Sequence, residues 1–213
     1  MTSVPPLQSI AAGELLQHVS RTSYRGSGLF FGQDGTNRYD SPAKAYGVLY
    51  LAFDLPTALM ESVFHKHRWH LQHKRTIALP EVESRMVRAV GLLQALQLAD
   101  ITAPGVMSTQ FGLNLSQLAS RRYSHTQRIS KNVHDLLDAG GQAQFDGLLY
   151  PSRNNYPAKC IALFEHARHK VWVADDVDLA DHRDWPDFVS RNRIGIVKPR
   201  ATRRPPPTGR SGP

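Results

Sequence analysis

The stretch that most constrains the fold is residues 47–61, where an apolar strand leads directly into a helix. Its first part, GVLYLAF at 47–53, is apolar enough and short enough for a buried strand. Asp54 follows as a predicted N-cap, and Pro56 fits a first turn, where a helix needs no backbone donor. Glu61 then falls among apolar residues of the helix. A carboxylate there is costly to bury, so it either reaches water or lines a cavity.

Two further polar residues flank or interrupt this strand. Arg38 follows a turn rich in Gly, Asn and Asp at residues 32–37, and Tyr50 lies in the middle of the strand. One short segment can therefore bring an arginine, a tyrosine and a glutamate together. Each residue also has a structural explanation: Arg38 can pair with Asp40 or Glu61, Tyr50 can be a core residue, and Glu61 can be a solvated helix residue.

The other predicted elements do not alternate as strand and helix. Residues 7–19 resemble a weak helix, or a helix followed by a strand, and the helix that holds Glu61 is expected to continue to about residue 73. The remaining pattern predicts strands at 75–79, 84–90, 160–164 and 170–174, a strand ending at Pro151, an ambiguous segment at 92–101 and a helix at 124–139. Strands then a helix then further strands favour an α+β fold with mostly antiparallel sheets over a doubly wound one.

A length of 213 residues fits one domain, predicted at residues 7–190, with a basic, proline-rich tail at 191–213. The tail holds seven Lys and Arg and no acidic residue, so the formal net charge of +8 is mostly a property of the tail. Its composition predicts disorder. Weak, salt-sensitive contact with nucleic acid is a possible role of this tail.

Several classes of function find no support. There is no long apolar run for a membrane helix and no signal peptide, and the single Cys160 allows neither an internal disulfide nor a cysteine-based zinc site. A reducing cytoplasm is therefore expected. Four histidines cluster after the strand–helix stretch, but no pair has i, i+4 spacing and no acidic ligand lies among them, so no metal site is expected (His65, His67, His70 and His73).

Five short segments, taken in order, resemble the RES-domain family, which is named for an Arg, a Glu and a Ser. They are NRYD at 37–40, VLYLA at 48–52, TALME at 57–61, DGLLYPSR at 146–153 and CIALFE at 160–165. They place Arg38, Tyr50, Glu61 and Ser152 at the family's motif positions. An upstream position that is often basic in the family falls at His18, followed by Arg21.

The resemblance implies a fold similar to ADP-ribosyltransferase toxins and a toxin that degrades NAD⁺ at the nicotinamide–ribose bond, by phosphorolysis or hydrolysis. NAD⁺ is then a substrate, phosphate a possible co-substrate, and no further cofactor is expected. The implied partner is an antitoxin of the Xre type, with a helix-turn-helix domain, in a hetero-oligomer. Alternatives are a mono-ADP-ribosyltransferase with a protein target, or a non-catalytic nucleic-acid-binding module that uses the tail.

The residue types suit that chemistry. Cleavage of the nicotinamide–ribose bond develops positive charge on the ribose, which the Glu61 carboxylate can stabilise. Arg38, helped by Arg21, can bind the pyrophosphate, because a guanidinium is a planar and permanently charged donor. Tyr50 can pack its ring on the nicotinamide or ribose. Ser152 can donate a hydrogen bond to the ribose or the carboxamide, although a turn role is the plainer explanation; no base is placed to make it a nucleophile.

Overall fold

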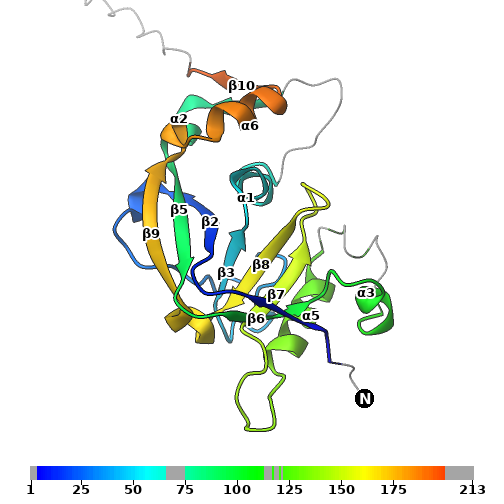
Figure 1. Cartoon of the computed structure of the whole chain (residues 1–213). Coiled ribbons are helices and arrows are strands. Elements are labelled where there is room, and N and C mark those ends of the chain that lie inside the picture. The colour runs from blue at the N-terminus through cyan, green and yellow to red at the C-terminus, as the bar shows by residue number, and fades with distance from the viewer. Residues whose placement is uncertain (1–3, 66–74, 113–116, 118–119, 121, 200–213) are drawn as a thin grey trace, which may run out of the picture.

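The fold is built on one curled β-sheet. A computed structural model describes residues 4–65, 75–112, 117, 120 and 122–199, and within these an eight-stranded sheet has the order β1-β6-β7-β8-β3-β2-β5-β9 (Figure 1). The strands are β1 (Leu7–Ile10), β2 (Leu15–Arg21), β3 (Val48–Ala52), β5 (Arg85–Leu92), β6 (Leu96–Asp100), β7 (Gly147–Pro151), β8 (Lys159–Phe164) and β9 (Val171–Asp178). Only β6 and β7 pair in parallel in this sheet. The predicted α+β class with mostly antiparallel strands is confirmed.

Short helices and a small second sheet surround the large sheet. The helices are α1 (Leu55–Glu61), α2 (Leu79–Glu83), α3 (Val106–Thr109), α5 (Ser124–His134) and α6 (Trp185–Arg191), with 3-10 turns at Thr22–Tyr24, Glu165–Lys170 and Leu179–Asp181. β4 (Arg75–Ala78) and β10 (Ile194–Val197) form a parallel pair. In Figure 1, α1 lies between the β2–β5–β9 part and the β7–β8 part of the sheet, below α2, α6 and β10.

The central strands are buried on both faces. In β3, Val48 and Ala52 belong to one apolar cluster and Leu49 and Leu51 to another, as the alternation of side chains along a strand requires. The first cluster also contains apolar residues of α1, α5 and α6, so these helices cover that face. Tyr50 packs against the same cluster. This alternation places the Tyr50 ring on the helix-covered face, where Glu61 also lies.

The helix predicted within residues 7–19 is wrong, because β1 and β2 occupy this segment. Gly13 turns the chain between them with φ +88°, a conformation that other residues rarely adopt. β1 pairs with β6, and β2 pairs with β5 along its whole length. These distant partners outweigh local helix propensity. The ambiguous segment 92–101 contains β6, which β1 and β7 flank.

Three other boundaries differ from the sequence-based expectation. α1 ends at Glu61, and the rest of the helix predicted to reach residue 73 falls partly on residues 66–74, outside the described part of the chain. α5 ends at His134, before the expected end at residue 139. The acidic residues 175–178 continue β9, where Asp176 pairs with the buried Arg88 at 2.8 Å. That ion pair stabilises an acidic segment as part of the sheet.

The segment predicted as tail begins inside regular structure. α6 ends at Arg191, and β10 follows at Ile194–Val197 to pair with β4. Regular structure thus extends beyond residue 190, the predicted end of the domain. Residues 200–213, with most of the basic, proline-rich sequence, lie outside the described residues. Among the residues that the structure describes, no helix is long and apolar enough to cross a membrane.

Candidate active site

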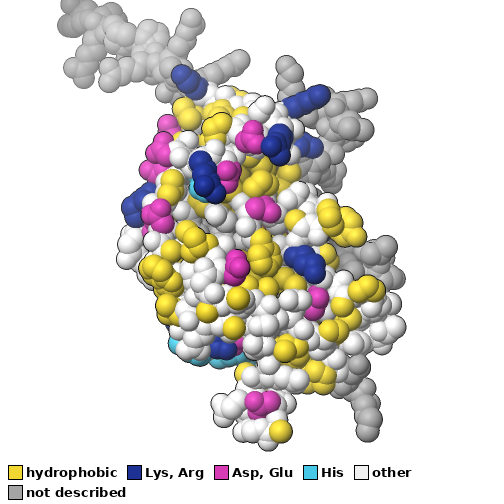
Figure 2. Space-filling view, viewed as in Figure 1, with side chains coloured by type: hydrophobic (Ala, Val, Ile, Leu, Met, Phe, Trp, Pro, Cys, Tyr) yellow, Lys and Arg dark blue, Asp and Glu magenta, His cyan; other side chains and the backbone are white. Residues whose placement is uncertain are grey.

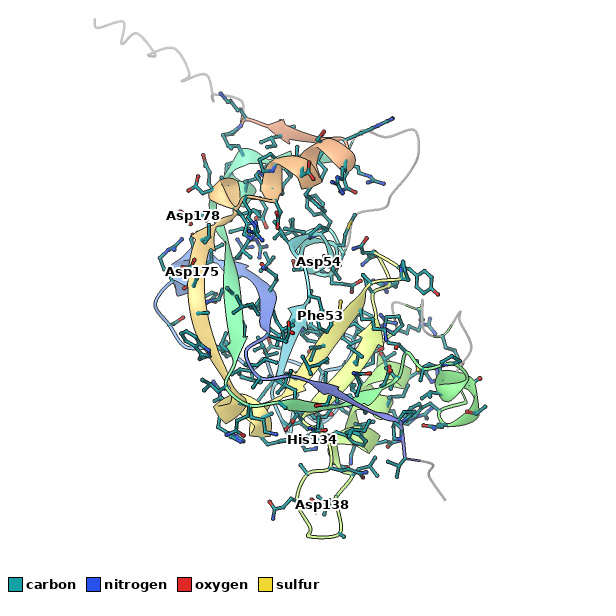
Figure 3. The ribbon with its side chains drawn as sticks, in the orientation of Figure 1. Phe53, Asp54, His134, Asp138, Asp175 and Asp178 are labelled. Atoms are coloured by element: carbon teal, nitrogen blue, oxygen red, sulfur yellow. The ribbon has the colours of Figure 1, made fainter. Side chains whose placement is uncertain are left out.

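The junction between β3 and α1 has the local structure that the sequence predicts. The Asp54 carboxylate accepts a hydrogen bond from the backbone N–H of Thr57 at 2.7 Å, and Pro56 lies in the first turn. Figure 3 shows Asp54 at the start of α1, beside Phe53 at the end of the strand. The predicted N-cap is therefore confirmed. Because α1 is only two turns long, Glu61 is its last residue and not an interior one.

The Glu61 carboxylate is fixed by the connection between β7 and β8. Its Oε1 accepts hydrogen bonds from the Ser152 hydroxyl at 2.7 Å, from the Asn154 backbone N–H at 3.0 Å and from the Asn154 side-chain amide at 3.4 Å. The same amide donates to the Met60 carbonyl at 3.1 Å. Oε2 accepts no hydrogen bond from the described residues. Three donors on one oxygen thus orient the carboxylate and leave the other oxygen available to a ligand.

Ser152 is buried behind this carboxylate, with 1% of its surface exposed. Its hydroxyl also accepts from the Asn155 backbone N–H at 2.9 Å, and its own N–H donates to Ala158 at 2.8 Å. The Asn155 side chain in turn donates to Thr57 of α1 at 2.8 Å. The connection after β7 is therefore bonded both to the start and to the end of α1. Ser152 acts in this geometry by holding Glu61.

The Tyr50 hydroxyl holds the turn that carries Arg38. It donates to the Asp40 carboxylate at 2.8 Å and accepts from the Tyr39 backbone N–H at 2.8 Å. Burial is the largest cause that raises the pKa of Tyr50 well above 10, and burial also raises the pKa of Tyr39 to about 12. Both phenols are neutral at physiological pH. The Tyr50 hydroxyl is committed to structure, and its ring is the part that faces the cavity.

Arg38 is buried beside the end of β7. Its Nη1 donates to the Pro151 carbonyl at 3.5 Å, and its guanidinium carbon lies 5.3 Å from the Tyr39 ring centre and 5.7 Å from that of Tyr150. These distances are in the range of cation–π contacts. Pro151 directly precedes Ser152, whose hydroxyl donates to the Glu61 carboxylate. Arg38 precedes β3 in the chain and Glu61 follows it, and the fold brings the two residues to the same region.

A cavity of about 430 Å³ opens where β2 and β3 separate. The two strands pair only at Gln17 and Ala52, whereas β2 continues beside β5 as far as Arg21. The His18 Nδ1 bonds the Tyr50 carbonyl at 3.0 Å across the gap. Burial lowers the pKa of His18, so the ring is neutral and Nδ1–H is the donor. The cavity walls come from β2, the turn before β3, β3, α1, the start of β5 and the β7–β8 region.

Comparison with known proteins identifies the family of the chain. The family model of the RES domain matches residues 10–186. The chain belongs to the RES-domain family. We found no match among curated protein sequences. Among solved structures, the crystal structure of the M. tuberculosis MbcT–MbcA toxin–antitoxin complex is similar, with a TM-score of 0.58 and 14% identity over 87% of this chain and 91% of that chain. The fold of this RES domain is therefore the ADP-ribosyltransferase-like fold that the sequence resemblance implied.

Not all of the residues singled out in the sequence line the cavity of this RES domain. Arg38, Tyr50 and Glu61 do, and Ser152 lies behind Glu61. Arg21 is not among the described lining residues: its side chain is 49% exposed and lies 3.6 Å from Glu81. The family resemblance placed Arg21 near the site because it follows His18, but its side chain at the end of β2 is half-exposed and lies beside Glu81.

Sequence reasoning missed several residues of the site. Asn154 and Asn155 bind Glu61, Ser152 and Thr57, and the only signal for them was their place in a polar turn after Pro151. Arg85 and Arg153 line the cavity. Cys160 lines it too, but burial raises the pKa of its thiol, so it remains protonated and unreactive.

The charge of the cavity is strongly asymmetric. Three arginines line it, Arg38, Arg85 and Arg153, whereas Glu61 is the single acidic residue among the described lining residues. Such a site suits a ligand with several negative charges and one region where positive charge develops. No group of three or more potential metal ligands occurs among the described residues of the RES domain, and His67, His70 and His73 lie outside them.

Proposed function

We propose that this RES domain is a toxin that consumes NAD⁺ by cleaving the bond between nicotinamide and ribose. The observation that carries the proposal is the Glu61 carboxylate, which three donors hold at Oε1 while Oε2 remains for a ligand at the cavity. A carboxylate fixed before the substrate arrives needs little reorganisation when charge develops. Family membership supports the assignment independently.

The chemistry requires stabilisation of a ribose that resembles an oxocarbenium ion. The bond between C1′ of the ribose and the nicotinamide nitrogen breaks, and nicotinamide leaves as a neutral molecule with the electron pair of that bond. An oxygen of water or phosphate then bonds to C1′ and loses its proton to solvent or to the phosphate itself. Glu61 Oε2 can accept a ribose hydroxyl and stabilise the transient positive charge. The Tyr50 ring supplies an apolar surface for nicotinamide or ribose.

Arg38 is assigned to the negative end of the substrate. Its guanidinium is buried and lies over the Tyr39 and Tyr150 rings, so little conformational freedom is lost when a phosphate oxygen binds. The same geometry keeps Arg38 close to the residue that holds Glu61. The substrate would thus bind with its pyrophosphate at arginine and its nicotinamide-bearing ribose at the carboxylate.

The test is NAD⁺ loss with purified, antitoxin-free protein, in the presence and absence of phosphate. Wild-type protein should release nicotinamide, with ADP-ribose-1″-phosphate as co-product for phosphorolysis or ADP-ribose for hydrolysis. Glu61→Gln should abolish the loss, and Glu83→Gln, on an exposed residue of α2, should not change it. NAD⁺ loss by a folded Glu61→Gln protein at the wild-type rate would refute the proposal.

The same assay separates the alternatives. Transfer of label from NAD⁺ to a protein would indicate a mono-ADP-ribosyltransferase that uses this site. Function that depends on the segment beyond Lys198 and not on Glu61 would indicate a nucleic-acid-binding module. On the face that Figure 2 shows, basic and acidic side chains are mixed around α2 and α6.

An antitoxin is the expected partner. The similar M. tuberculosis structure is a toxin–antitoxin complex that matches 87% of this chain, and the sequence resemblance implies an antitoxin of the Xre type. Co-expression with the product of the neighbouring gene should restore growth and yield a stable hetero-oligomer. Growth arrest that persists beside a stably bound partner would contradict this role.

A further inference from the structure

We propose that Arg85, and not Arg21, is the second arginine that binds the pyrophosphate of NAD⁺. The inference rests on the proposed function, which it deepens by assigning a residue to the substrate. The two arginines face each other directly across β2 and β5. In an antiparallel pair, residues opposite each other lie on the same side of the sheet. They are therefore neighbours with equal formal charge, and only their surroundings distinguish them.

Glu81 of α2 is the common partner of the two arginines. Its Oε2 lies 3.6 Å from Arg21 Nη1, and its Oε1 accepts from Arg85 Nε at 2.8 Å and from Arg85 Nη2. One carboxylate thus offsets the repulsion between two cations that the sheet places side by side. Its stronger geometry is with Arg85, where two guanidinium nitrogens converge on one oxygen. Glu81 therefore acts as a positioning residue for Arg85.

Burial separates the two arginines. The Arg21 side chain is 49% exposed and also donates to Ser84 at 3.3 Å, whereas the Arg85 side chain is 18% exposed and lines the cavity. Exposed charges are screened by salt within about 10 Å, but partly buried charges are screened much less. An anion in the cavity therefore interacts more strongly with Arg85. Arg21 is left as an outer charge that helps to hold Glu81.

Arg85 also keeps donors free for a ligand. Only Nε and Nη2 bond Glu81, so the two N–H groups of Nη1 donate to no described residue. Their guanidinium is already oriented, which lowers the entropic cost of binding. Charged donors of this planar kind form strong hydrogen bonds with phosphate oxygens. Arg85 has the position, the charge and the unused donors that a pyrophosphate site needs.

The arrangement places cations on two walls of the cavity. Arg38 lies near the end of β7, and Arg85 begins β5; β8, β3 and β2 lie between them in the sheet. Both arginines line the same cavity, and the inference places the pyrophosphate between them. The inference also restricts substrates: a ligand with the nicotinamide–ribose bond but without the pyrophosphate should not use Arg85.

The experiment compares Arg85→Met with Arg21→Met in the full-length protein. Each variant removes one cation beside Glu81 and leaves the other, so each controls for the general loss of charge. ADP-ribose binding is measured by calorimetry, because this ligand has a pyrophosphate and no bond to nicotinamide. Arg85→Met should raise the Kd about 10- to 100-fold, as expected for the loss of charge-assisted hydrogen bonds. Arg21→Met should leave the Kd close to wild type.

Kinetics give a second readout. Arg85→Met should raise KM for NAD⁺ with little change in kcat, while cleavage of nicotinamide riboside, which has no phosphate, stays unchanged. Arg85→Lys should recover part of the affinity, and it provides a folded comparison if the Met variant melts at a much lower temperature. An unchanged Kd in Arg85→Met, an equal loss in Arg21→Met, or no ADP-ribose binding by wild type overturns the inference. Retained NAD⁺ loss in Glu61→Gln instead refutes the proposed function, whatever the binding data.

Discussion

Ser152→Ala is the most direct test of how the fold prepares Glu61. The substitution removes one oxygen atom from a residue that is 1% exposed, so it creates little empty space. It deletes the hydrogen bond to the Glu61 carboxylate at 2.7 Å and the one accepted from the Asn155 N–H at 2.9 Å. Glu61 keeps both donors of Asn154. The carboxylate should therefore remain in place on average but become less tightly oriented.

The expected cost to stability follows from these two bonds. A hydrogen bond to a charged group contributes about 1.5–3 kcal/mol, and the Asn155 N–H adds little to the loss because it is only part-buried. A total of about 2–3 kcal/mol is expected, which corresponds to about 5–10 °C in Tm for a chain of this size. Even a domain with only about 5 kcal/mol of stability would remain about 97% folded at 25 °C. Loss of activity at that temperature would therefore report on geometry and not on unfolding.

Activity should fall further than the folded fraction does. A small displacement of a reacting group can lower a rate by about 100-fold, so kcat for NAD⁺ loss is expected to drop about 10- to 100-fold. Thermal melting and initial rates at 25 °C measure the two effects separately.

Ser41→Ala is a matched control, because Ser41 is 2% exposed and its hydroxyl accepts one neutral hydrogen bond, from Ala45 at 2.9 Å. It should lose about 1 kcal/mol and no kcat. Equal losses of Tm with normal kcat in both variants would refute the idea that Ser152 orients Glu61.

Three further predictions address the structure around the site. Tyr50→Phe should lower stability by about 1–3 kcal/mol, because the hydroxyl bonds two buried partners. It should leave KM for NAD⁺ unchanged because the ring remains, and a large rise in KM would show that the hydroxyl binds substrate. Gly147→Ala should cost about 2–4 kcal/mol in urea unfolding, since a Cβ would clash with the Ala162 carbonyl of β8, and a neutral result would contradict the close pairing of β7 with β8. Stability should also fall as pH drops from 7.5 to 5.5. Burial lowers the pKa of His18, His166 and His182 in the folded protein below the unfolded value of 6.5, so the unfolded chain binds more protons in this range. An unchanged midpoint of urea unfolding between these pH values would contradict the prediction.

Some structure was predictable because its cause is local. The β3–α1 junction depends on an apolar run, an Asp at the cap and a Pro in the first turn, all within residues 47–61. β8 was predictable for a similar reason, since five consecutive apolar residues at 160–164 are buried on both faces. The family motifs also placed the segments that hold Arg38, Tyr50, Glu61 and Ser152 in one group before any geometry was known.

Other elements depended on partners far away in the chain. Residues 7–19 have no strong helical or strand pattern, and they became strands because β5 and β6 provide hydrogen-bonding partners about 80 residues later. The acidic end of β9 lies beyond the strand predicted at 170–174, and there Arg88 on β5 gives Asp176 a buried ion pair. Local composition carries no information about such pairings.

The sequence by itself determined the family, the mixed α+β class and the set of residues that deserve mutation, because these depend on residue types and their order. Only the tertiary structure showed which of these residues support others and which can contact a ligand. The Tyr50 hydroxyl and Ser152 support other residues, while Oε2 of Glu61 and Nη1 of Arg85 retain capacity for a ligand. It also moved the second cation of the cavity from Arg21 to Arg85. The physical reason is the separation of β2 from β3, because a one-dimensional motif cannot specify where two strands stop pairing and a cavity opens.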